Sequence, residues 1–141
     1  MALIKSISGI RGTIGGKPGT ALTAIDIVKF SAAYGSIISE TREDKKAPAT
    51  IVIGRDGRIS GEMVSSLVIN TLVSLGINVI DLGLSTTPTV EIATKAEGAH
   101  GGIIITASHN PKEWNALKLL NGEGEFIDAQ TGAEVLTRAQ I

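Results

Sequence analysis

The stretch that decides the fold is GGIIITASHNP, residues 101–111. Its opening glycines and isoleucines are typical of a β-strand that is buried on both faces. Asn110 and Pro111 then favour a turn rather than a continued strand. Ligands bind beyond the carboxyl ends of strands in open α/β sheets. The hydroxyl of Ser108 and the imidazole of His109 are therefore candidates for a functional site.

Strand and helix patterns alternate along the rest of the chain. Apolar and β-branched runs predict strands at residues 3–7, 50–53, 77–82 and 101–106. Helical spacing predicts helices at 24–40, 62–75, 87–96 and 131–141. Residues 115–120 and 125–127 are expected to form a hairpin at the sheet edge, and the glycine-rich segment 8–20 a long functional loop. This pattern predicts an α/β fold: a three-layer α/β/α sandwich around a mainly parallel mixed sheet with an antiparallel edge.

The composition limits both the size of the protein and its partners. The 141 residues fit one domain, spanning 1–141, with a core of its own. The 13 lysines and arginines nearly balance 14 acidic residues, which gives no electrostatic attraction for nucleic acid or an anionic membrane. The sequence contains no cysteine and no apolar run long enough to span a bilayer. We therefore expect a cytoplasmic protein that binds neither nucleic acid nor membranes.

Residue chemistry alone leaves two interpretations of Ser108. The serine either carries a phosphate, held there by backbone N–H groups and nearby cations, or it stabilises a chain reversal. The turn role is the more common one for a serine in such a loop. His109 is likewise more often an oriented turn residue than a base or a metal ligand.

Cationic side chains adjoin several of the predicted strands: Arg11, Arg55, Arg58 and Lys118. Arg11, in SGIRG, combines a flexible backbone with a forked cation that suits phosphate, although a lone loop arginine is usually only solvated. Arg55 or Arg58 is expected to face the same end of the sheet as Ser108, but a local pair of Arg55 with Asp56 is favoured. Lys118 could serve a phosphate as proton acceptor or charge stabiliser, or merely protect a sheet edge from aggregation.

Other motifs are excluded by their composition or spacing. GTIGGKPG, residues 12–19, resembles a nucleotide phosphate loop, but Pro18 stands where Ser or Thr should bind magnesium. No GxSxG nucleophile elbow occurs, and two separated histidines do not make a zinc site. Trp114, beside the serine loop, is expected to be a lid or core residue.

Five motifs together resemble the first domain of the phosphohexomutases, the phosphoglucomutase and phosphomannomutase superfamily. They are SGIRG (8–12), GRDGR (54–58), TPT (87–89), TASHNP (106–111) and NALK (115–118). The resemblance covers essentially the whole chain. Because TASHNP resembles the phosphoserine loop of that family, it reverses the expectation that Ser108 is only a turn residue.

The resemblance implies a reaction and a set of site residues. Ser108 would give a phosphoryl group to a sugar monophosphate, form a hexose 1,6-bisphosphate, and take back the other phosphoryl group. Phosphate would thus move between the 1- and 6-positions of glucose, mannose or glucosamine phosphates. Arg11 would hold the phosphoserine, and Asn110 and Lys118 would contact phosphate. Lys118 and His109 would assist proton transfer and charge stabilisation, and Mg²⁺ would bind the phosphate on Ser108.

The resemblance also implies that residues 1–141 are domain I of a larger multidomain enzyme. This chain has no counterpart of the family's acidic magnesium loop, its sugar-selecting loop, or the domain that clamps the second phosphate, so the chain alone is expected to be inactive. A docking face for the missing domains would be exposed and would allow self-association. Two other functions stay open: a non-catalytic α/β module that binds a phosphorylated ligand at the serine loop, and an interaction domain.

Overall fold

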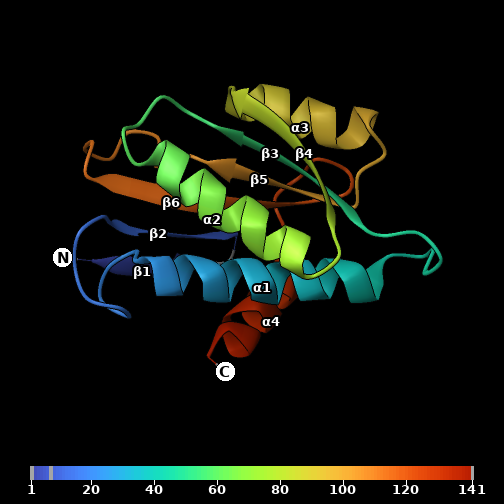
Figure 1. Cartoon of the computed structure of the whole chain (residues 1–141), viewed down its shortest axis with the longest axis horizontal. Coiled ribbons are helices and arrows are strands. Elements are labelled where there is room, and N and C mark those ends of the chain that lie inside the picture. Colours follow the sequence, from blue (N-terminus) through green and yellow to red (C-terminus); the bar gives the residue numbers. More distant parts are fainter. Residues whose placement is uncertain (1, 7, 141) are drawn as a thin grey trace.

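The computed structural model describes residues 2–6 and 8–140, which form six strands and four helices (Figure 1). The strands are β1 (Leu3–Ser6), β2 (Gly9–Thr13), β3 (Thr50–Arg55), β4 (Asn78–Leu84), β5 (Gly101–Ile105) and β6 (Trp114–Asn121). The helices are α1 (Ala24–Thr41), α2 (Gly61–Ser74), α3 (Thr87–Ala96) and α4 (Ala129–Ala139). Helices and strands alternate from α1 to β5, as the sequence predicts.

All of these strands belong to one sheet, in the order β1-β2-β6-β5-β3-β4. β3 pairs in parallel with β4 and β5. β6 pairs antiparallel with β5 and β2, and β1 pairs antiparallel with β2. Because β2 and β5 both run opposite to β6, they share the direction of β3 and β4. The predicted mainly parallel mixed sheet is confirmed, and β2, β3, β4 and β5 end at the same edge.

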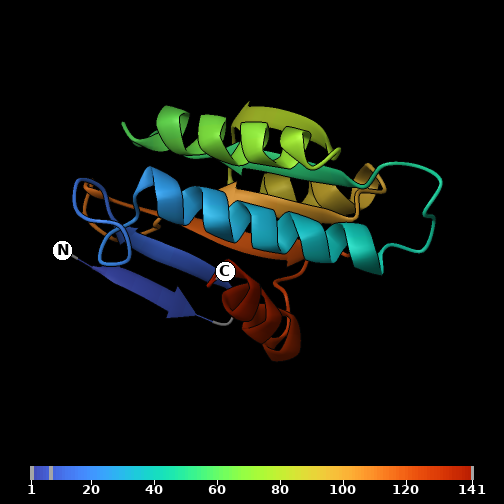
Figure 2. The same ribbon diagram turned by 60° about the horizontal axis from the view of Figure 1, so that its bottom comes forward.

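Helices cover both faces of the sheet and so give three layers (Figure 2). α1, α2 and α4 lie on one face above the larger core. α3 lies on the opposite face, where Val90 packs in a smaller core with Ile104 of β5. The alternation of side chains along a strand explains how β5 supplies both cores, since Ile103 and Ile105 belong to the first and Ile104 to the second. The predicted α/β/α sandwich is confirmed.

Tyr34 of α1 ties this helix to the start of β5. Its hydroxyl accepts a hydrogen bond from the N–H of Gly102 at 3.0 Å and donates one to the carbonyl of Leu120 at 2.5 Å. A side chain at Gly101 would overlap the same hydroxyl, so the close approach of the tyrosine requires a glycine there. Burial raises the pKa of Tyr34, and the hydroxyl therefore keeps the proton that it donates.

Two sequence predictions are wrong. Residues 9–13 of the expected loop 8–20 form strand β2, where glycine serves close strand packing: a Cβ on Gly9 would overlap the carbonyl of Leu117 in β6. The predicted edge hairpin is reduced to an antiparallel bridge between Leu120 and Phe126, and it does not lie at the edge because β6 lies inside the sheet. β1 and β2 form the antiparallel edge instead. Ile7 and Ile141, which end a predicted strand and helix, lie outside the described residues.

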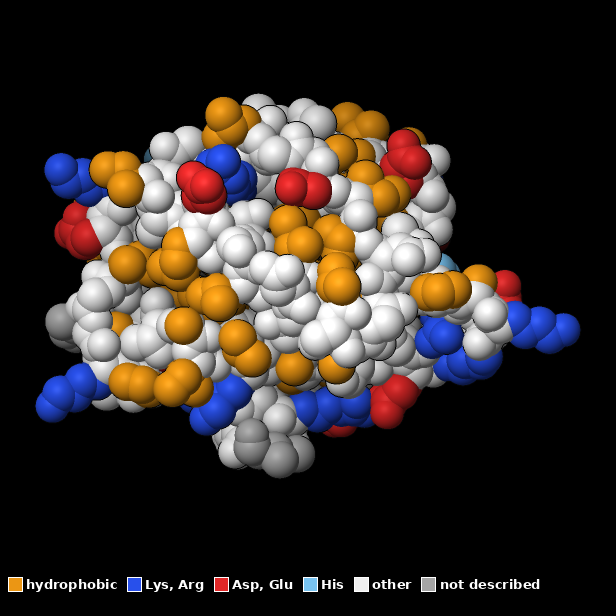
Figure 3. All heavy atoms as spheres, in the orientation of Figure 1, with side chains coloured by type: hydrophobic (Ala, Val, Ile, Leu, Met, Phe, Trp, Pro, Cys, Tyr) orange, Lys and Arg blue, Asp and Glu red, His pale blue; other side chains and the backbone are white. Residues whose placement is uncertain are grey.

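The outer surface carries apolar side chains among charged ones. Figure 3 shows them gathered on the face that α1 and α2 form, where the exposed residues include Ile25, Val28, Met63 and Val73. The expected docking face for further domains stays a prediction. No helix of the described part of the chain is long and apolar enough to cross a membrane.

Candidate functional site

The serine loop connects β5 to β6, which are antiparallel neighbours. Ser108 is exposed in this loop and has a φ of 51°, the only positive φ outside glycine among the described residues. A left-handed backbone at such a residue costs about 1–3 kcal/mol and persists only where the surroundings hold it. The contacts around Ser108 must therefore fix the loop.

Arg58 supplies most of these contacts from the turn after β3. One guanidinium nitrogen donates to the carbonyls of Ser108 and Asn110 at 2.8 and 2.9 Å. The other donates to the carbonyls of Pro111 and Trp114 at 2.7 and 3.0 Å. The planar fork of arginine suits this arrangement because it presents several donors in fixed directions. Arg58 thus holds the serine loop by its backbone.

Asp56 orients Arg58 and the start of the loop. Its carboxylate accepts hydrogen bonds from the Thr106 hydroxyl at 2.5 Å and from Nε of Arg58 at 3.3 Å. The Thr106 hydroxyl in turn accepts from the N–H of Ser108 at 3.1 Å. The favoured pair of Arg55 with Asp56 is wrong, because the carboxylate pairs with Arg58 and Arg55 reaches only the Asp56 carbonyl, at 3.4 Å.

Lys118 forms a direct hydrogen bond with Ser108: its Nζ donates to the serine Oγ at 2.6 Å. Lys118 lies on β6 opposite Gly9 of β2 and Ile104 of β5. Its neighbours Leu117 and Leu119 belong to the larger core, so the alternation along β6 turns Lys118 to the other face of the sheet. From there its flexible stem carries the ammonium to the serine loop.

Arg11 lies one strand further along the same face. It pairs with Ala116 across the β2–β6 ladder, and its guanidinium donates to Oδ1 of Asn110 at 3.4 Å. The structure therefore brings together all five predicted site residues around a hollow of about 260 Å³, which is lined by Arg11, Ala107, Ser108, His109, Asn110, Ala116 and Lys118. His109 is exposed at this hollow.

The charges of the hollow favour an anion. Arg11 and Lys118 line it, and none of its lining residues is acidic. A tetrahedral anion on Ser108 would lie beside Lys118 and within reach of Arg11, where both cations would offset its charge. Within the described residues, no group of three or more His, Cys, Asp or Glu side chains is arranged to hold a metal ion.

Sequence reasoning missed the role of Arg58: it expected Arg55 or Arg58 to face the same end of the sheet as Ser108 but assigned neither of them a contact with the serine loop. The signal was the position of GRDGR, which spans the end of β3, a strand that neighbours β5 and runs in its direction. Residues after two such strands meet at one sheet edge.

Two other sequence features lie outside the serine hollow. The TPT motif begins α3, where the Thr86 hydroxyl caps the helix by accepting a hydrogen bond from the N–H of Thr89. Trp114 is half-buried at the start of β6 and contributes its carbonyl to Arg58.

Comparisons with known proteins show which family the chain belongs to. The family model of the phosphoglucomutase/phosphomannomutase alpha/beta/alpha domain I matches residues 3–140. A phosphoglucomutase/phosphomannomutase of Thermococcus kodakarensis is 42% identical over 108 residues, which are 77% of this chain and 23% of the relative. A phosphoglucosamine mutase of Streptococcus pneumoniae is 38% identical over 127 residues, which are 90% of this chain and 27% of the relative.

The fold is similar to a solved structure as well. A putative phosphomannomutase from Thermus thermophilus superposes with a TM-score of 0.84 at 23% identity, over 99% of this chain and 30% of the other. The chain belongs to the phosphoglucomutase/phosphomannomutase domain I family. It spans about a quarter of the length of the curated relatives described here, 23% and 27%.

Proposed function

We propose that this chain is the phosphoserine-bearing domain I of a magnesium-dependent phosphohexomutase. The enzyme would move phosphate between the 1- and 6-positions of glucose, mannose or glucosamine phosphates through a hexose 1,6-bisphosphate. The observation that carries this proposal is the 2.6 Å contact between Lys118 Nζ and Ser108 Oγ, in a hollow that Arg11 also lines and that no acidic residue lines. The family membership of residues 3–140 supports it.

The contacts suggest how the residues would share the reaction. A hydroxyl of the sugar would attack the phosphorus on Ser108, form a new P–O bond, and break the bond to Oγ. Lys118 would give a proton to the departing Oγ, and the proton of the sugar hydroxyl would pass to Lys118 or His109. Arg11 and Lys118 would stabilise the charge on the transferred group. Arg58 touches only the loop backbone and so would act by positioning Ser108.

In this domain, the phosphate on Ser108 would coordinate Mg²⁺. Phosphate oxygens are hard donors of the kind that Mg²⁺ prefers, and the exposed serine would present them at the rim of the hollow. Asp56, the carboxylate beside the loop, is engaged by Thr106 and Arg58. When bound, the metal would neutralise charge on the phosphoryl group.

A non-catalytic module that binds a phosphorylated ligand is the second candidate. The same cationic hollow favours it, because Arg11 and Lys118 would bind an anion whether or not Ser108 is phosphorylated. The two functions differ only in the covalent chemistry of the serine.

Mutase activity of a longer protein that carries this chain separates these functions. It would be assayed with magnesium and a bisphosphate primer on glucose, mannose and glucosamine phosphates, beside the 141-residue chain and Ser108→Ala. We expect activity only in the longer protein, loss of turnover in Ser108→Ala, and one preferred sugar. Turnover by Ser108→Ala would refute the phosphoserine role, and inactivity of every form would favour the binding module.

A further inference from the structure

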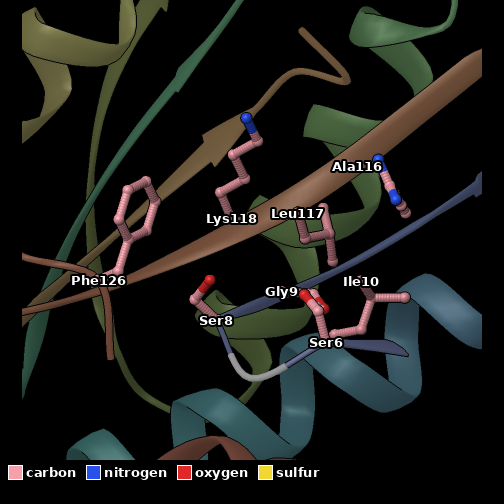
Figure 4. A pocket seen from close by; sticks show the side chains of 9 residues that line it. Ser6, Ser8, Gly9, Ile10, Ala116, Leu117, Lys118 and Phe126 are labelled. Carbon is pink, nitrogen blue, oxygen red and sulfur yellow. Dashed lines mark hydrogen bonds between the residues drawn. The ribbon is translucent and has the colours of Figure 1, made fainter. Parts of the chain in front are cut away.

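Asn115 is a fully buried polar residue without a role in the anion chemistry of the serine hollow. It lies on β6 three positions before Lys118, and it is not among the residues that line the hollow. Side chains alternate along a strand, so Asn115 shares its side of β6 with Leu117 of the larger core. Figure 4 shows Leu117 and Lys118 on opposite sides of this strand. Asn115 therefore faces the layer of α1, α2 and α4, away from Lys118.

Both polar atoms of the Asn115 side chain are hydrogen-bonded. Nδ2 donates to Ser60 Oγ at 2.9 Å, and Oδ1 accepts from the N–H of Ala116 at 2.9 Å. Burying an amide group without such partners would cost free energy, so the two bonds fix its position. Ser60 lies in the turn between β3 and α2. The contact thus joins β6 to a segment 55 positions earlier in the chain.

Ser60 does not cap α2, although it directly precedes that helix. Its side chain makes no capping hydrogen bond, and its φ of −74° and ψ of −8° are helical, whereas a capping serine usually has an extended backbone. The hydroxyl is instead engaged by Asn115. The contact therefore determines where the turn lies and adds nothing to the start of the helix.

The turn is attached to the start of β6 at two neighbouring residues. Ser60 binds the Asn115 side chain, and Arg58 donates to the Trp114 carbonyl at 3.0 Å. The N–H of Gly61 donates to the Arg58 carbonyl at 2.9 Å, which links the two attachments within the turn. A displacement of Ser60 from β6 would therefore move Arg58 as well.

Arg58 and β6 each hold one member of the pair formed by Ser108 and Lys118. Arg58 donates to the Ser108 carbonyl at 2.8 Å. β6 carries Lys118, whose Nζ donates to Ser108 Oγ at 2.6 Å. The bond between Ser60 and Asn115 therefore completes a closed ring of contacts around the serine loop.

Resting on the function proposed above, we propose that Asn115 is a positioning residue for Ser108. Acting through Ser60, it fixes the turn that carries Arg58 and so sets the distance between Ser108 Oγ and Lys118 Nζ. The side chain of Asn115 hydrogen-bonds to neither of these atoms. Phosphoryl transfer depends on such positioning, because a displacement of about 1 Å can cost about 10²-fold in rate.

Steady-state kinetics of the proposed full-length mutase measure the effect on the reaction. Ser60→Ala should lower kcat on the order of tenfold, the size of one hydrogen bond, and leave KM within about twofold. Ser60→Thr should restore most of the turnover, because it keeps a hydroxyl for Asn115. The double variant Asn115→Leu/Ser60→Ala should lose no more turnover than Asn115→Leu alone, since both substitutions remove the same contact.

Thr94→Val is the matched control for these variants. Thr94 is fully buried, and its hydroxyl donates to the Val90 carbonyl at 2.7 Å within α3, on the opposite face of the sheet. The substitution removes one buried hydrogen bond far from the turn and should leave kcat unchanged. Melting curves give the folded fraction of each variant, so that kcat is compared per folded molecule.

Nuclear magnetic resonance of the 141-residue chain tests the positioning without turnover. In Ser60→Ala and Asn115→Leu, the signals of Ser108 and of the Lys118 side chain should shift. Thr94→Val should leave both signals unchanged. If Asn115→Leu does not fold, Ser60→Ala decides the question, because Ser60 is only half-buried.

Two results would overturn the positioning role. One is unchanged Ser108 and Lys118 signals in Ser60→Ala, and the other is a parental kcat for Ser60→Ala in an active mutase. Both leave the phosphoserine proposal standing, because the turnover of the parent and of Ser108→Ala decides that proposal. If the longer protein has no mutase activity, the proposed function fails, and the signals of Ser108 and Lys118 alone decide whether Asn115 positions the loop.

Discussion

The backbone is fixed by different means at the start of β5 and beyond its end. At the start, the buried Tyr34 hydroxyl bridges Gly102 and Leu120, and Gly101 leaves room for the ring. Beyond the end, the exposed Ser108 loop is held by the guanidinium of Arg58 on its carbonyls. Close packing fixes the first region, and polar contacts at the surface fix the second. Changes at the start of β5 should therefore affect stability, whereas changes beyond its end should affect the proposed reaction.

The largest expected effect is at Lys118, the cation on the serine. In the proposed full-length mutase, Lys118→Met should lower turnover about 10²–10³-fold, the usual loss when one donor to a developing charge is removed. The melting temperature should hardly change, because the ammonium lies at the surface. Lys112→Met, a change in the same loop outside the serine hollow, is the control. Equal turnover losses in the two variants would contradict the role of Lys118.

The next largest effect on turnover is expected from substitution of Arg58. Arg58→Ala removes the partner of four loop carbonyls, two of them in part-buried hydrogen bonds, and one of the partners of Asp56. We expect a cost of about 1–3 kcal/mol in the free energy of unfolding. Turnover should fall with little change in KM, and Arg58→Lys should restore little of it, because an ammonium does not match the guanidinium fork. Chemical denaturation and steady-state kinetics measure the two effects.

Arg42→Ala is a matched control for Arg58. Arg42 also donates to backbone carbonyls, among them that of Ala47 at 2.9 Å, but after the end of α1. Its loss should leave turnover unchanged. If Arg58→Ala also keeps full turnover, the loop does not depend on the guanidinium, and the comparison between the two regions fails.

The start of β5 should show the opposite pattern. Tyr34→Phe leaves the buried N–H of Gly102 and the carbonyl of Leu120 without their shared partner and should cost about 1–3 kcal/mol in unfolding free energy. Gly101→Ala should destabilise by a similar amount, about 1–3 kcal/mol, because the new methyl group meets the tyrosine hydroxyl. Turnover per folded molecule should stay normal in both. A selective loss of turnover would show that the two regions are coupled.

The smallest effect concerns acid stability at the start of α1. Burial alone would raise the pKa of Asp26, but hydrogen bonds from the Thr23 hydroxyl and N–H and from the Gly19 N–H outweigh it and lower the pKa. A lowered folded-state pKa gives stability above the unfolded value of 3.8, which is lost as the pH falls through the folded pKa. Below about pH 4, the Asp26→Asn variant should therefore lose less stability than the parent protein. Melting curves recorded across this pH range measure the difference. Identical acid profiles would refute this contribution.

The features that could be predicted from the sequence are those that produce a local residue pattern. The strand that ends before Ser108 and the alternation of elements follow from apolar periodicity. The motifs around Ser108 and Lys118 predict residues that the structure brings together around one hollow. The glycines at 9 and 12 were misread as loop formers because their use, close contact with neighbouring backbone, depends on pairing with β6 and on the packing of residues 2 and 22. The Arg58 contacts were missed because they join segments about fifty positions apart and involve backbone carbonyls, which leave no residue pattern.

The proposed reaction requires a phosphoryl group on Ser108. The proposed full-length mutase would be incubated with a hexose 1,6-bisphosphate and magnesium, digested, and mapped by peptide mass spectrometry. We predict one phosphate on the peptide that contains Ser108, and its loss when hexose monophosphate is added. Phosphate on another residue, or turnover without any phosphate on Ser108, would contradict the account.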